Sequence, residues 1–310
     1  LETGNGSESL SQEKKQEERN TETRSRFIVI KIADPICQSK GKNSDRALTM
    51  MMHSANLSMM KKIPLLILVF APWVVCFGTA KPNVVLIMAD DVGCEPIGCY
   101  GGESFATPHV DALAKTGMRF EHCYSMPVCH PSRIALMTGR YPFRLKSGWG
   151  SFPKAEEGFS IGRVMQRAGY ATAVAGKWQM TLMKKDPKQP GRTGFDEWLL
   201  FGWREGARFH DPMLYQNDKP ARTMTESYGP DLYAQFLSSF IERSHKREKP
   251  FFAYFPMALA HDVTDDLKWQ VPYVPGKDRW MNYGEMIASM DATVGKLMAT
   301  LDRLGIRKDT

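Results

Sequence analysis

Apolar residues after residue 80 recur in patterns that predict both strands and helices. Asn83–Ala89 and Phe251–Pro256 are unbroken apolar runs, and the first is rich in β-branched residues. Runs of this kind are typical of strands that are buried on both faces of a parallel sheet. Tyr170–Ala175 and Met118–Tyr124 are more mixed in composition, and they predict two further strands.

Four segments between these runs have helical character. Asp231–Ser244 carries apolar pairs every four residues, and Tyr283–Leu304 carries apolar residues at steps of three and four. A shorter helix is expected from Thr107-Pro108 to Thr116, because Thr suits an N-cap and Pro suits the first helical position. Ser160–Ala168 predicts another. Residues 181–227, rich in Pro, Gly and charge, are predicted to be a long surface excursion.

The alternation of strands and helices predicts an α/β fold with a mixed, mostly parallel central sheet and helices on both faces. We interpret residues 81–310 as a single catalytic domain. The last predicted helix should lead into another buried strand, but the sequence ends at Thr310. We therefore expect the sheet to be truncated at its C-terminal side, with at least one central strand missing.

The N-terminal residues predict an export signal rather than a folded domain. Residues 1–59 are polar and lack sustained periodicity, and Met60-Lys61-Lys62 is followed by the apolar stretch Ile63–Phe77 and by Gly78-Thr79-Ala80. A basic start, an apolar core and a small-residue cleavage site in this order are typical of a signal peptide, here residues 60–80. We predict a secreted or periplasmic protein that meets the membrane only during export. The alternative is a membrane anchor, for which the apolar stretch is short.

The charge distribution and the cysteine spacing exclude some kinds of binding partner. The chain has 310 residues, with 41 Lys and Arg against 34 Asp and Glu, and the two signs are interspersed. This pattern is not the concentrated basic face of a nucleic-acid binder, so we expect no nucleic-acid partner. None of the six cysteines has the spacing of a zinc site. Four of them lie in residues 81–310, and an exported protein could pair some of these.

Cys129 and Arg133 have the sequence context of an anion site. Pro131 suits the first position of a helix, which would place Cys129 just before the helix N-terminus, and Gly139 would end that helix. Unpaired N–H groups and the helix dipole attract anions to such a terminus. The planar guanidinium of Arg133, one turn into the helix, can bind a sulfate or a phosphate. The segment therefore predicts an anion site with a reactive side chain at its mouth.

Asp90 and Asp91 predict a cation site. They directly follow the buried strand Asn83–Ala89, at the end of the strand where open α/β sheets bind their ligands. Two adjacent carboxylates would repel each other there unless a cation lay between them. Oxygen ligands favour calcium or magnesium.

These motifs together resemble the formylglycine-dependent sulfatases of the alkaline phosphatase superfamily. Cys129-His130-Pro131-Ser132-Arg133, followed by an apolar run and Thr138-Gly139-Arg140, is similar to the sulfatase signature. Pro82–Gly93 and Thr107–Ala114 are similar to the opening segments of the same family. One departure is His130, where the family usually has a small residue that takes no part in the chemistry.

The resemblance implies an alkaline-phosphatase-like fold and covalent catalysis. Cys129 would be oxidised to Cα-formylglycine by a maturation enzyme, and one hydroxyl of the aldehyde hydrate would attack sulfur and displace the alcohol. The second hydroxyl would then expel sulfate and restore the aldehyde. A serine has no second hydroxyl and could not release its sulfate ester in this way. The resemblance also implies that Asp90, Asp91 and residue 129 bind Ca²⁺, in preference to Mg²⁺.

Three more residues acquire roles from the resemblance. Gly176-Lys177-Trp178 matches a motif in which the Lys contacts the sulfate, and His261 lies where the family has a His that contacts the sulfate and protonates the leaving group. Gln179 stands where the family usually has His; it can hydrogen-bond a ligand but cannot take up a proton. The expected catalytic residues are Cys129, Arg133, Lys177 and His261, and the expected substrate-binding residues are Lys177, His261 and Gln179.

The function that the resemblance implies is hydrolysis of sulfate esters, as in arylsulfatases, on a sulfated small molecule or glycan. Two calcium ligands and a second active-site Lys of the family are absent from the sequence, so we expect residues 1–310 alone to be inactive. One alternative is a phosphodiesterase or phosphonate monoester hydrolase of the same superfamily, because sulfate and phosphate esters differ mainly in charge. A non-catalytic relative that binds sulfated glycans is another, and a gene fragment without function is a third.

Overall fold

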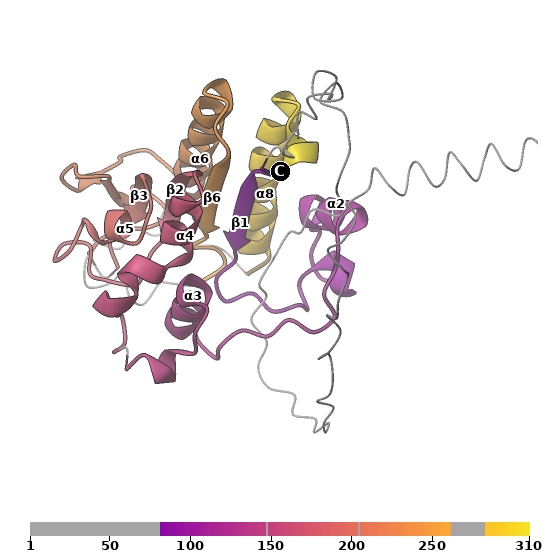
Figure 1. Ribbon diagram of the computed structural model, residues 1–310. Coiled ribbons are helices and arrows are strands. Elements are labelled where there is room, and N and C mark those ends of the chain that lie inside the picture. Colours follow the sequence, from indigo (N-terminus) through magenta and orange to yellow (C-terminus); the bar gives the residue numbers. More distant parts are fainter. Residues whose placement is uncertain (1–80, 147, 204, 262–282) are drawn as a thin grey trace, which may run out of the picture. The chain divides into compact units, whose positions relative to one another are not determined.

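The computed structural model describes residues 81–146, 148–203, 205–261 and 283–310 (Figure 1). The predicted upstream segment 1–59 and signal peptide 60–80 lie outside the described residues. Among the helices that are described, none combines the length and the apolar character needed to cross a membrane.

A six-stranded sheet in the order β1-β6-β2-β3-β4-β5 forms the centre of the fold. Its first four strands are parallel, and β4 and β5 extend it as antiparallel strands. The strands are β1 (Val84–Met88), β2 (Ala171–Lys177), β3 (Glu197–Phe201), β4 (Met213–Gln216), β5 (Arg222–Thr223) and β6 (Phe251–Pro256). The predicted mixed, mostly parallel sheet is confirmed.

Helices connect the strands, and their bounds agree with most of the predictions. The α-helices are α2 (Pro108–Thr116), α3 (Cys129–Thr138), α4 (Ile161–Arg167), α5 (Gln189–Arg192), α6 (Gly229–Lys246) and α8 (Tyr283–Arg303). The 3₁₀ turns are η2 (Gly98–Tyr100), η3 (Pro142–Arg144), η4 (Lys154–Phe159) and η5 (Arg307–Asp309).

Apolar side chains fill both faces of the sheet, as the unbroken apolar runs predict. Successive residues of a strand point to opposite faces, and here they enter two separate apolar clusters. The cluster shared with α2, α6 and α8 contains Ala173, Ala175, Leu199, Phe201, Phe251, Ala253 and Phe255. The cluster shared with α3 and α4 contains Val174, Trp198, Leu200, Phe252 and Tyr254. Both faces of the central strands are therefore covered by helices.

The predicted strand Met118–Tyr124 is wrong. This segment has no regular secondary structure, and all of its residues are exposed. A strand needs a hydrogen-bonded neighbour for its backbone. Among the described residues β1 pairs only with β6, so no strand of the described sheet lies beside this segment.

The predicted surface excursion 181–227 is also wrong in part. It contains β3, β4 and β5, and Phe195, Trp198 and Leu200 within it are almost fully buried. The many Pro, Gly and charged residues of this segment suggested a loop, although short apolar segments among them pair as strands at the edge of the sheet.

The N-terminus of α2 is fixed by a residue that lies 182 positions further along the chain. The carboxylate of Asp291, buried in α8, accepts hydrogen bonds from the backbone N–H groups of His109 (3.1 Å) and Val110 (2.9 Å). Thr107, the expected N-cap, instead accepts a bond from the N–H of Gly98 and donates one to Asp111. The first turn of α2 is thus capped by α8, which links the two helices.

We predict that Asp291→Ala destabilises the fold by about 1–3 kcal/mol, because it leaves two N–H groups at the start of α2 without a buried acceptor. The free energy of unfolding, measured by urea denaturation, checks this. Asp302→Ala, a change to an exposed residue of the same helix, is the matched control. Equal losses in the two variants would contradict the proposed cap.

Candidate functional site

The chain brings Asp90 and Asp91 beside His261 through backbone pairing that continues past β1 and β6. The N–H of Met257 bonds the carbonyl of Met88, the N–H of Asp90 bonds the carbonyl of Leu259 (2.8 Å), and the N–H of Ala260 bonds the carbonyl of Asp90 (2.7 Å). The segments that leave the two parallel strands therefore run together at the carboxyl edge of the sheet, where ligands bind in open α/β folds.

The carboxylate of Asp90 is buried between two cations. Its Oδ1 accepts a hydrogen bond from Nη2 of Arg133 (3.1 Å), and its Oδ2 accepts one from Nζ of Lys177. All three side chains are at most 1% exposed. Burial alone would raise the pKa of Asp90, but the charges of Lys177 and Arg133 outweigh it and hold the pKa below its usual value. Asp90 is therefore ionised.

Lys177 is the last residue of β2, and the glycine before it lets the end of the strand approach β6 closely. Gly176 has φ +122°, and a Cβ atom there would lie 2.1 Å from the carbonyl oxygen of Pro256 on β6. Arg133 anchors the same strand end by donating from Nη1 to the Lys177 carbonyl (2.7 Å). Burial lowers the pKa of the Lys177 amine, and the attraction of Asp90 offsets this only in part.

Cys129 is the first residue of α3 rather than the residue before it. The helix begins two residues earlier than predicted, with Val128 as its N-cap and Pro131 inside the first turn. The hydroxyl of Ser132 donates to the carbonyls of Val128 (2.9 Å) and Met126 (3.1 Å), which fixes the approach to the helix. The thiol is half-buried. It still lies in the first turn, where helix N–H groups favour anions.

Cys129 lies one turn before Arg133 in α3, so the two residues share a face of the helix. Burial would lower the pKa of Arg133, but the charge of Asp90, with a smaller contribution from Cys129, raises it above its usual value. A charge on Cys129 also opposes the lowering of the Lys177 pKa. The structure thus brings four of the predicted site residues into one cluster: Asp90, Cys129, Arg133 and Lys177.

Asp91 and His261 form the outer part of the site. Nε2 of His261 lies 3.4 Å from Oδ2 of Asp91, with the side chains 26% and 53% exposed. Asp91 has φ +55°, a left-handed backbone that is uncommon for a residue other than glycine. Strained backbone of this kind gathers at functional sites.

Gln179 follows Lys177 by two residues and is almost fully buried, at 5% exposed. Its backbone is left-handed, with φ +53°. Its side-chain oxygen makes no hydrogen bond with any group in the part of the chain that the structure describes. Between these two residues, Trp178 is buried and donates from Nε1 to Gln189 (2.9 Å), which holds the loop in place.

His130, the departure from the family signature, has a structural role. Its Nε2 donates to the carbonyl of Ser151 (3.1 Å), and its ring packs against Trp149 with 5.3 Å between the ring centroids. Burial lowers the pKa of His130, which keeps the imidazole neutral. A large side chain is accommodated next to Cys129 because it fastens the segment after α3 to the start of that helix.

The side chains of Asp90 and Asp91 are of the chemical type that binds a hard cation such as calcium. Asp90 and Asp91 supply carboxylate oxygens, and Asp90 uses two of the roughly four acceptor positions of a carboxylate in its bonds to Arg133 and Lys177. Calcium prefers about six to eight oxygens. Among the described residues, no group of three or more His, Cys, Asp or Glu side chains gathers in a way that could hold a metal ion.

Sequence reasoning missed Arg208. Its side chain is buried, and its guanidinium carbon lies 4.9 Å from the ring centroid of Phe201. Phe201 ends β3 and pairs in register with Lys177, so Arg208 adds positive charge beside the site. Burial is the main cause that lowers the pKa of Lys177, and the positive charge of Arg208 lowers it further. No local motif marks Arg208, because only the pairing of β2 with β3 brings it near.

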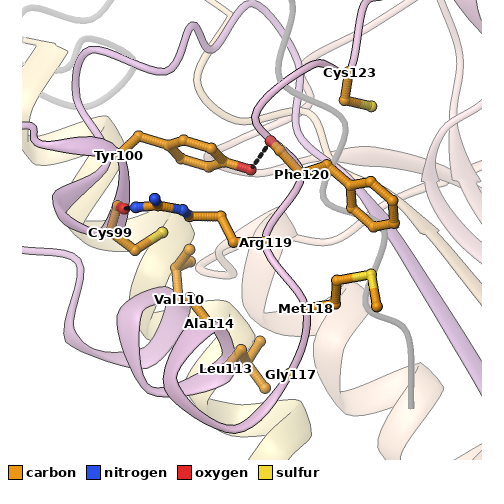
Figure 2. Close-up of a pocket in the computed structure, with 10 residues that line it drawn as sticks. All are labelled: Cys99, Tyr100, Val110, Leu113, Ala114, Gly117, Met118, Arg119, Phe120 and Cys123. Carbon is orange, nitrogen blue, oxygen red and sulfur yellow. Dashed lines mark hydrogen bonds between the residues drawn. The ribbon is translucent and has the colours of Figure 1, made fainter. Parts of the chain in front are cut away.

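A separate hollow lies between η2, α2 and the segment that follows α2 (Figure 2). Tyr100 donates to the carbonyl of Phe120 (3.1 Å) across it, and Arg119 donates to the carbonyl of Cys99. Cys99 and Cys123 line the hollow as free thiols, as Cys94 and Cys129 also are in the described chain. None of the predicted site residues lines it, so it is not the candidate site.

Comparison with known proteins identifies the family. A family model described as Sulfatase matches residues 82–310, which is most of the chain. The chain belongs to the sulfatase family. Similar proteins include N-acetylgalactosamine-6-sulfatase of Rattus norvegicus, 31% identical over 265 residues, which cover 74% of this chain and 48% of the relative. Arylsulfatase A of Homo sapiens is 30% identical over 265 residues, covering 74% of this chain and 50% of the relative.

Solved structures agree with this assignment. The crystal structure of Ps i-CgsB is similar with a TM-score of 0.61 and 29% identity, covering 73% of this chain and 56% of the other. Its complex with k-i-k-neocarrahexaose gives a TM-score of 0.57 and 27% identity, with the same coverage. The chain spans about half the length of the curated relatives it matches.

We predict that Asp90→Asn destabilises the sulfatase by about 3–5 kcal/mol, because it leaves Arg133 and Lys177 buried together without a counter-charge. Adding Lys177→Met should restore part of the loss. Urea unfolding in the presence of a chelator measures both effects. The exposed change Asp218→Asn is the control, and a loss in Asp90→Asn no greater than in this control would contradict the charge cluster.

Proposed function

We propose that the whole protein is a sulfuric ester hydrolase of the arylsulfatase type, with residues 81–310 as the front part of its catalytic domain. The observation that supports this best is the buried cluster of Asp90, Arg133 and Lys177 beside Cys129.

The cluster has an excess of positive charge. One ionised carboxylate stands against the two cations that it bonds, and the N-terminal N–H groups of α3 add a further partial positive charge. Because these groups are buried and already oriented, a bound sulfate would meet donors that need little rearrangement. A negative charge that grows on the sulfate oxygens during the reaction would be stabilised in the same way.

The residue at position 129 supplies the nucleophile in this proposal. Its conversion to formylglycine replaces the thiol by an aldehyde, and needs a maturation enzyme and an external oxidant. Asp90 and Asp91, together with residue 129, would hold calcium, which when bound would polarise the sulfate and the hydroxyl that attacks it. Arg133 positions Asp90 and the end of β2, and Lys177 contacts the sulfate.

His261 is the group that would protonate the leaving alcohol. Its contact with Asp91 orients the ring at the exposed side of the site, where an alcohol could leave. Gln179 cannot share this task, because an amide does not take up a proton at neutral pH.

Sulfated glycans are the proposed substrates. Relatives are named for sulfated amino sugars, such as N-acetylgalactosamine-6-sulfatase, and the similar Ps i-CgsB has been solved with a bound oligosaccharide. Export through the segment 60–80 would bring the protein to such substrates outside the cytoplasm.

We predict that the full-length protein, produced together with a maturation enzyme, carries formylglycine at position 129. Mass spectrometry should find the peptide that contains this residue about 18 Da lighter than its cysteine form. The modified protein should hydrolyse an aryl sulfate much faster than an aryl phosphodiester, and Cys129→Ala should abolish the sulfatase activity. An unmodified thiol and no hydrolysis would contradict the proposal, and preference for the phosphodiester would favour the rival hydrolase.

We predict that His261→Gln affects substrates according to their leaving groups. With an alkyl sulfate, whose alcohol needs a proton to leave, kcat should fall by about 10²–10⁴-fold. With 4-nitrophenyl sulfate, whose leaving group departs as a stable anion, the loss should be less than about tenfold. Steady-state kinetics on the two substrates checks this. Equal losses would show that His261 does not act as the general acid.

A further inference from the structure

Gln179 combines two unfavourable features that no contact among the described residues offsets. Its left-handed backbone, at φ +53°, is unfavourable for a residue other than glycine. Its buried side-chain oxygen lacks a hydrogen-bond donor among the described residues. Buried polar groups are nearly always paired, so an unpaired one beside a binding site indicates a ligand that completes it.

The packing around Gln179 buries its side chain, including the oxygen that has no hydrogen-bond donor among the described residues. Trp178 is fixed by its bond to Gln189, and Lys177 is fixed by Asp90. These anchors restrict the loop on the N-terminal side of Gln179 and limit its freedom to turn the amide towards solvent. The site therefore retains an acceptor that is ready before any ligand arrives.

The chemistry of the amide oxygen restricts what that ligand can be. An amide oxygen only accepts hydrogen bonds, and the oxygens of an ionised sulfate ester also only accept. The missing partner must therefore be an O–H or N–H donor. A hydroxyl group of a sugar, carried close to the sulfate that Lys177 holds two residues away, supplies such a donor.

We propose that Gln179 selects substrates by accepting a hydrogen bond from a sugar hydroxyl adjacent to the sulfate ester. The inference rests on the proposed function, and it narrows the substrate class to sulfated sugars with a free hydroxyl next to the sulfated carbon. A site built to pair with a hydroxyl discriminates strongly against an analogue without it, because the buried acceptor is then left unpaired.

The test measures binding in the Cys129→Ala variant of the full-length protein, which cannot form the aldehyde hydrate. Any hydroxyl preference in this background cannot come from the formylglycine. The ligands are methyl galactoside monosulfates that carry the sulfate at each position in turn, each paired with an analogue whose neighbouring hydroxyl is replaced by hydrogen. Calorimetry gives the dissociation constant of each member of a pair.

We expect at least one hydroxyl-bearing ligand to bind about tenfold more tightly than its deoxy analogue. Gln179→Met, which keeps the size of the side chain and removes its polar atoms, should bring this ratio close to one. Gln179→Glu keeps an acceptor, so it should retain the ratio although its charge weakens binding of both sulfates. Gln235→Met, the same change at an exposed glutamine of α6, is the matched control and should leave the ratio unchanged.

Two results would overturn the inference. One is a hydroxyl preference that persists in Gln179→Met, and the other is the absence of any preference in the Cys129→Ala protein, including a failure of all the sulfates to bind. The mass of the peptide around position 129 and aryl sulfate hydrolysis test the proposed function separately. A modified, active protein without the hydroxyl preference would therefore contradict only the role of Gln179.

Discussion

A carboxylate buried between two cations is the constraint on which the site depends. Asp90 follows β1, Lys177 ends β2 and Arg133 belongs to α3, so one set of contacts joins three elements that lie far apart in the sequence. Removing ions from water is costly, and only mutual bonding makes it tolerable. The same bonds hold the two cations at the start of α3, beside Cys129. The arrangement that stabilises this edge of the sheet is thus the one we propose for anion binding.

Local rules fail where this site lies, which is typical of functional regions. Asp91 and Gln179 adopt left-handed backbone conformations, and the amide oxygen of Gln179 is buried without a donor in the described chain. The packing of the sheet can offset the free-energy cost of these features, because β2 and β6 are buried along nearly their whole length and pack on helices at both faces. The well-packed strands therefore stabilise the strained backbone of Asp91 and Gln179 at the carboxyl edge of the sheet.

The buried central strands and the long helices follow from the sequence, because unbroken apolar runs and apolar steps of three and four have few other interpretations. The grouping of Asp90, Arg133 and Lys177 could also be expected from the sequence, since each belongs to a recognisable motif, while their roles stay predictions. The strands within 181–227 and the position of Arg208 could not be expected, because they depend on pairing with β2 rather than on local pattern. Met118–Tyr124 has the composition of a strand but no neighbouring strand among the described residues. The capping of α2 by Asp291 joins residues too distant for any local signal.

The central claim is that the cluster around Asp90 is an anion site that holds sulfate beside position 129. Titration calorimetry with inorganic sulfate tests it most directly, because binding of this ion requires neither maturation nor turnover. We expect one saturable site per chain, with binding weakened by added salt and by Lys177→Met but not by Lys184→Met, a change to an exposed lysine. Absence of saturable binding, or equal binding by Lys177→Met, would contradict it.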